Sequence, residues 1–76
     1  SSSFESLRDR VVMQYDFFAK EIDRHAAVIA AISESNRVLN VASLEDRRQL
    51  QLILQSISEI REKMNKTRAR VSRINK

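Results

Sequence analysis

The stretch VVMQYDFFAKEIDRHAAVIAAISESNRVL, residues 11–39, decides the fold of this 76-residue chain. Its seam residues recur in alternating steps of four and three, which defines a heptad repeat. The d positions hold Val11, Phe18, His25, Ile32 and Leu39, and the a positions hold Tyr15, Ile22, Ile29 and Asn36. A repeat of this kind keeps one α-helix in contact with another along its length. We therefore expect a long helix over about residues 3–39.

A second heptad repeat fills the other half of the chain. Its a positions are Leu50, Ile57, Met64 and Val71, and its d positions are Ile53, Ile60, Thr67 and Ile74. Ser43 is a good N-cap, and Glu45 and Asp46 follow it where a helix N-terminus favours negative charge. These signals predict a link at about residues 40–42 and a second helix over about residues 43–75. The polar cluster around residues 33–36 is an alternative place for the break.

The two repeats predict one fold-back register. If the chain turns at residues 40–42, a positions face d positions, as in Phe18 with Met64, and the two residue numbers of every such pair sum to 82. The sequence thus predicts an all-α, single-domain antiparallel two-helix hairpin, coiled-coil-like, over residues 1–76. The predicted seam inside the hairpin comprises Val11, Tyr15, Phe18, Ile22, His25, Ile29, Ile32, Leu50, Ile53, Ile57, Ile60, Met64 and Val71.

The composition excludes several classes of protein. The chain has no Gly, Pro, Cys or Trp, so it lacks the usual residues of tight turns, phosphate-binding loops, disulfides and thiolate metal sites. Its longest uncharged run, residues 25–33, is shorter than the roughly 20 residues of a transmembrane helix. No Ser, His and acid set converges and no metal-ligand spacing occurs. We expect an intracellular, cytoplasmic protein that is not an enzyme, with no transmembrane segment, cofactor or metal.

Apolar residues outside the seam indicate a further interface. In a lone hairpin, Val12, Met13, Phe17 and Leu54 would face water. Exposed apolar patches of this kind usually mark interaction sites. We therefore expect the hairpin to complete a four-helix bundle, by homo-oligomerisation or by docking with helical partner subunits, and to act as a protein–protein assembly module or scaffold.

Two polar residues on the first repeat leave alternatives open. His25 could be a core residue with a local hydrogen bond, or a pH-sensitive group, because burial disfavours the charged form of histidine. Asn36 could specify register and oligomer state, as a buried polar a-position residue can. Alternatively, Asn36 lies in a wet layer at the end of the hairpin, opposite Asp46.

The second helix ends in a basic run, Lys63, Lys66, Arg68, Arg70 and Arg73. Cations stabilise the C-terminal end of a helix. The rival interpretation is an electrostatic module that binds an anionic membrane surface or nucleic acid. These residues surround the helix and no aromatic residue alternates with them, so a peripheral membrane contact remains open and nucleic acid is not expected.

Phe17-Phe18 on the first helix, together with Ile60, Asn65-Lys66, Arg68, Val71 and Ile74 on the second, resembles the N-terminal regulatory helices of syntaxin-type membrane-fusion proteins. The resemblance covers about a third of the chain. It implies an antiparallel three-helix bundle that regulates SNARE pairing and binds accessory proteins. The 76 residues include no third helix, SNARE motif or membrane anchor, and we transfer no functional site from this family.

Overall fold

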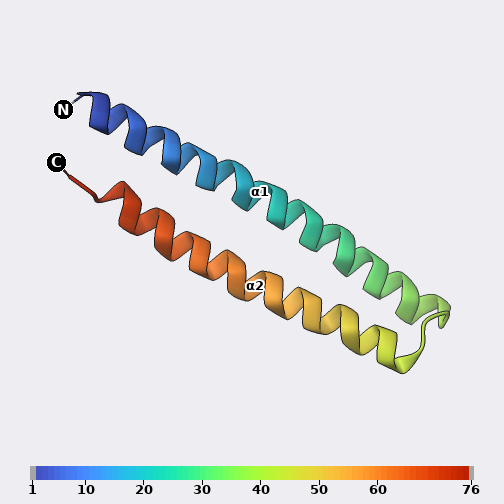
Figure 1. The fold of residues 1–76 in the computed structure, drawn as a ribbon. Helices are drawn as coiled ribbons and strands as arrows, with labels where there is room; N and C mark the ends of the chain where they lie inside the picture. Colours follow the sequence, from blue (N-terminus) through green and yellow to red (C-terminus); the bar gives the residue numbers. More distant parts are fainter. Residues whose placement is uncertain (1, 76) are drawn as a thin grey trace.

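The computed structural model, which describes residues 2–75, is a hairpin of two antiparallel helices (Figure 1). Helix α1 spans Ser2–Leu39 and helix α2 spans Leu44–Ser72. The hairpin measures 58 × 15 × 11 Å, and both termini lie at the same end of it. The predicted all-helical hairpin is confirmed, and no strand occurs within residues 2–75. Residues 1 and 76 of the predicted domain lie outside the described part of the chain.

The link between the helices begins with a left-handed residue. Asn40 follows the last residue of α1 with φ 54°, a conformation that asparagine tolerates better than most residues. Ser43 has an extended backbone, and its hydroxyl accepts a hydrogen bond from the Asp46 N–H at 3.1 Å, as the sequence predicted for an N-cap. The link therefore reverses the chain without glycine or proline.

Helix α2 ends earlier than the sequence suggested. Its last helical residue is Ser72, whereas the sequence predicted a helix to about residue 75. The Arg73 N–H donates to the carbonyl oxygens of Arg70 and Val71, and the Ile74 N–H donates to Val71 at 3.0 Å. These bonds close the helix in a tightened last turn, a common way to satisfy terminal carbonyl groups.

An arginine from one helix contacts the C-terminal end of the other at both ends of the hairpin. At the link, Arg47 Nη2 donates to the Asn40 side chain at 2.6 Å and lies 3.5 Å from the Asn36 carbonyl oxygen. At the open end, Arg8 Nη1 donates to the Ile74 carbonyl oxygen at 3.0 Å. Both arginines bring positive charge to the negative end of a helix dipole, so they hold the two helices together where each would fray.

The seam uses the predicted a rows but a different second row. Tyr15, Ile22, Leu50 and Met64 are half-buried, as expected for a positions. The d residues of α1 in this region are exposed; the row one position after them is buried or half-buried instead and comprises Val12, Ala19, Ala26 and Ser33, and Glu21 is half-buried as well. The matching row of α2 holds Arg47, Leu54, Arg61 and Arg68.

Small side chains account for this choice. Ala19, only 7% exposed, is the one buried residue among those whose side chains the structure describes. Alanine and serine at every second turn, seven residues apart, allow two helix backbones to approach closely, while phenylalanine, histidine and isoleucine at the d positions would hold them apart. The predicted seam residues Val11, Phe18, His25, Ile32, Ile53 and Ile60 are accordingly exposed in the hairpin.

One side of the seam carries hydrogen-bonded pairs between the helices. Arg68 bonds to Asp16 and Arg61 to Asp23, each with its nearer nitrogen 2.9 Å from the carboxylate. The Gln51 side chain donates to the Ser33 hydroxyl at 3.0 Å. The first two pairs lie seven residues apart on both helices, so the register is constant. The d rows project on the opposite side of the seam, and the two sides of the hairpin therefore differ in polarity.

Candidate functional site

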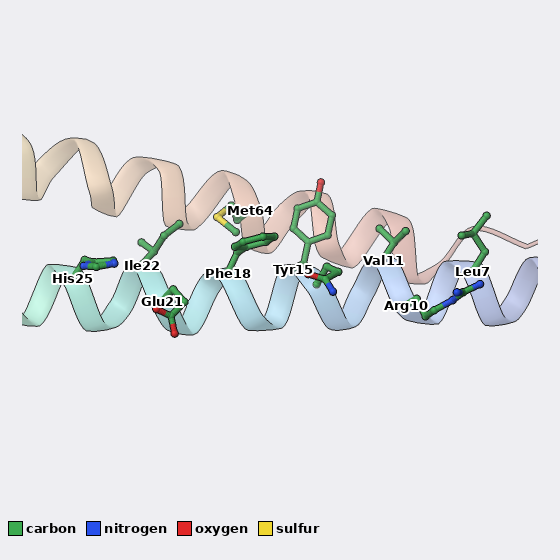
Figure 2. A pocket seen from close by; sticks show the side chains of 10 residues that line it. Leu7, Arg10, Val11, Tyr15, Phe18, Glu21, Ile22, His25 and Met64 are labelled. Carbon is green, nitrogen blue, oxygen red and sulfur yellow. The ribbon is translucent and has the colours of Figure 1, made fainter.

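An open apolar groove runs along the hairpin, and none of the residues that line it belongs to the Asp–Arg pairs (Figure 2). Its volume is about 610 Å³. Most of its apolar lining comes from α1, with Met64 contributed by α2; the lining comprises Leu7, Arg10, Val11, Gln14, Tyr15, Phe18, Glu21, Ile22, His25 and Met64. Figure 2 shows Val11, Tyr15, Phe18 and Ile22 directed from α1 toward α2.

Tyr15 and Met64 define the boundary between the two sides of the hairpin. Both residues line the apolar groove, and both also line a smaller cavity of about 190 Å³ beside Asp16, Arg61 and Arg68. They therefore lie in the middle of the seam. Phe18 and Met64 line the same groove, so the predicted partners do face each other, but across an open surface instead of a closed interface.

The groove continues toward the chain termini. Leu7 and Val11 also line a cavity of about 180 Å³ whose other walls include Phe4, Val71 and Ile74. In the other direction, the d positions of both helices continue the apolar surface. Ile32 of α1 and Ile53 and Ile60 of α2 each have about half of their surface exposed. A single apolar face thus runs along most of the hairpin.

The residues predicted as a partner surface divide into two groups. Val12 and Leu54 are half-buried on the same rows as Ala19 and Arg61, so they belong to the contact between α1 and α2. Met13 and Phe17 are exposed but do not line the groove. Phe17 instead packs edge-on against Phe18, with ring centroids 5.6 Å apart. Met13 and Phe17 therefore face solvent as the sequence predicted, whereas Val12 and Leu54 do not, because helical spacing alone does not say which of two adjacent rows closes the hairpin.

Most of the predicted anion-binding residues have partners within the hairpin. Arg68 bonds to Asp16, and this bond lowers the pKa of the Asp16 carboxyl and raises the pKa of the Arg68 guanidinium. Lys66 lies 3.4 Å from Glu62, and Arg73 donates to the Ala69 carbonyl oxygen. Arg70 donates to Thr67, and Lys63 is exposed. The basic run is therefore dispersed and partly neutralised, which differs from the concentrated cationic surface expected of a nucleic-acid site.

The two polar residues of the first repeat lie in different settings. His25 lines one end of the groove and is exposed to solvent. Asn36 is half-buried near the link, and its carbonyl oxygen faces Arg47. Within residues 2–75, no three His, Asp or Glu side chains gather closely enough to hold a metal ion. Neither described helix has an apolar stretch that could cross a membrane.

No family model matches the chain, and no curated protein or solved structure matches it either. The interpretation of the groove therefore rests on its residues and geometry.

Proposed function

We propose that this protein is a non-enzymatic assembly module in which the long apolar face of one hairpin, which includes the groove, packs against the same face of a second copy, forming a four-helix bundle. The observation that supports this proposal is the contrast between a long apolar face and a nearly absent core. Within the described side chains, Ala19 alone is buried, while the face holds Phe18 and several half-exposed isoleucines.

The surface area of the hairpin favours association. A compact protein of 8.8 kDa exposes about 4,800 Å² by the usual scaling of surface with mass, whereas this chain exposes 6000 Å². A compact particle of twice the mass exposes about 7,900 Å², so pairing would remove about 4,000 Å² in total. Stable specific interfaces need about 1,200–2,000 Å². The available area is therefore more than sufficient.

The energetic gain comes from the d rows. Burying one large apolar side chain stabilises a complex by roughly 1.5–3 kcal/mol. Phe18, Ile32, Ile53 and Ile60 are each about half exposed in the hairpin, so each contributes about half of this value from each copy. Their combined burial would offset the lost freedom of association, which costs at least about 4 kcal/mol.

Sedimentation equilibrium of the purified chain tests the proposal. We expect a mass twice the 8.8 kDa of one chain, insensitive to salt and unchanged by duplex DNA or anionic vesicles. A monomer at all concentrations would overturn the proposal. Binding to a polyanion with a steep salt dependence would instead support the electrostatic class of function.

Two neighbouring phenylalanines provide a matched pair of variants. Phe17 and Phe18 are 56% and 54% exposed, and each loses the same ring–ring contact when the other is truncated. Only Phe18 lines the groove. Phe18→Ala should shift the chain toward monomer at concentrations where Phe17→Ala still dimerises. Equal effects of the two substitutions would remove the groove from the interface.

A further inference from the structure

The two halves of the hairpin differ in shape. We define the open half as residues 2–20 and 62–75, and the loop half as residues 21–61. The hollow part of the apolar face lies mainly in the open half, where Val11, Phe18 and Met64 line the groove. In the loop half, the same face carries Ile32, Ile53 and Ile60, each about half exposed. One half thus provides a concave surface and the other provides apolar side chains of suitable size.

The two halves also differ in charge. The open half contains eight basic and four acidic residues, a formal charge of +4. The loop half contains five basic and six acidic residues, a formal charge of −1. Asp23 and Arg61, which bond to each other, both belong to the loop half, so this division separates no ion pair between the helices.

Symmetry allows two ways to pack the apolar faces of two copies together. If the two-fold axis runs along the hairpin, every residue lies level with its own copy. The two open halves then meet. The groove of one copy faces the groove of the other, and two surfaces that each carry a formal charge of +4 come together. If the axis runs across the hairpin, the open half of each copy lies on the loop half of the other, and a positive surface meets a slightly negative one.

We infer that the second copy docks in the inverted orientation, so that the groove of each copy receives isoleucines from the loop half of the other. This inference rests on the proposed self-association. It brings α1 against α1 in antiparallel register. The d row of α1 is symmetric about the midpoint between Phe18 and His25, so inversion places Val11 against Ile32 of the second copy and Phe18 against its His25. Along the interface, d residues of the groove of one copy then contact d residues of the loop half of the other copy.

Distance measurements between single spin labels test the orientation. The chain has no cysteine, so Val41→Cys in the link provides one labelling site per copy. In the inverted dimer, the two labels lie at opposite ends of the particle, with a separation near the 58 Å length of the hairpin. In the other arrangement they would lie within about two helix diameters, roughly 25 Å. Pulsed electron–electron double resonance distinguishes these two distances.

A label in the middle of the hairpin provides the control. A label at Lys20→Cys would lie near the two-fold axis of the inverted dimer. In the other arrangement it would lie level with the same label of the second copy, so both arrangements predict a short distance between the two labels. A short distance at residue 20 with a long one at residue 41 supports the inference. Short distances at both sites would overturn the orientation but leave the dimer intact. No dipolar coupling at either site, with a monomer mass in sedimentation, would overturn the proposed function as well.

Discussion

Arg68 donates two hydrogen bonds to the carboxylate of Asp16, at 2.9 and 3.2 Å, although 52 positions separate the two residues in the chain. The contact is partly exposed, and its side chains lie beside the seam instead of inside it. Exposed ion pairs contribute little to stability but can select one alignment of two helices over another. Asp16–Arg68 and Asp23–Arg61 therefore specify the register of the hairpin more than its stability.

Charge reversal at this pair should be reciprocal. Asp16→Arg places two guanidinium groups together, and Arg68→Asp places two carboxylates together, so each should lower the thermal unfolding midpoint. The double variant restores opposite charges and should recover most of the loss, measured by circular dichroism. Asp9→Arg is the control, because Asp9 contacts its neighbour Arg8, and Arg68→Asp should not rescue it. A double variant no better than the worse single variant would contradict the pairing.

The stabilising effect of Asp16 should disappear in acid. The hydrogen bonds from Arg68 hold the pKa of Asp16 below its ordinary 3.8, so the folded chain favours the ionised form. This contribution is present above pH 3.8 and is lost as the pH falls through the lower pKa of the folded state. Denaturation curves of the natural chain and Asp16→Asn should differ at pH 6 and converge near pH 2. A difference that persists in acid would contradict the ionic contribution.

A larger side chain at Ala19 should separate the helices. Ala19 is buried on the row where α1 meets α2, and it lies beside Met64 and Asn65 at one wall of the cavity of about 190 Å³. Ala19→Leu should destabilise the hairpin by about 1–3 kcal/mol through overpacking. Ala27→Leu is the control, because Ala27 is exposed and its substitution should change stability by less than about 0.5 kcal/mol. Equal unfolding midpoints for the two variants would exclude close packing at Ala19.

Removal of the N-cap of α2 should weaken the link end. Ser43→Ala deletes the hydroxyl that accepts the Asp46 N–H and should cost about 1 kcal/mol in urea denaturation. Ser58→Ala, in the exposed interior of the same helix, should be neutral or slightly stabilising because alanine has the higher helix propensity. If both variants behaved alike, Ser43 would have no capping role.

Local and periodic signals predicted most of the fold. The heptads of residues 11–39 and 50–74 predicted two helices, and Ser43 with its two following acids predicted where the second begins. The end of α2 was not predicted, because Arg73 and Ile74 carry no helix-breaking signal and the contact of Arg8 with the Ile74 carbonyl oxygen is tertiary.

By itself, the sequence determined that this chain forms two amphipathic helices that fold back once, because heptad spacing and capping are properties of neighbouring residues. Only the tertiary structure decided which rows meet. Ala19 and Ala26 let the backbones approach on one side of the a row, and the Asp–Arg pairs formed there. The bulkier Phe18 and Ile32 were left on the open side. That choice depends on the fit of two surfaces across the hairpin, which helical spacing within either stretch does not encode.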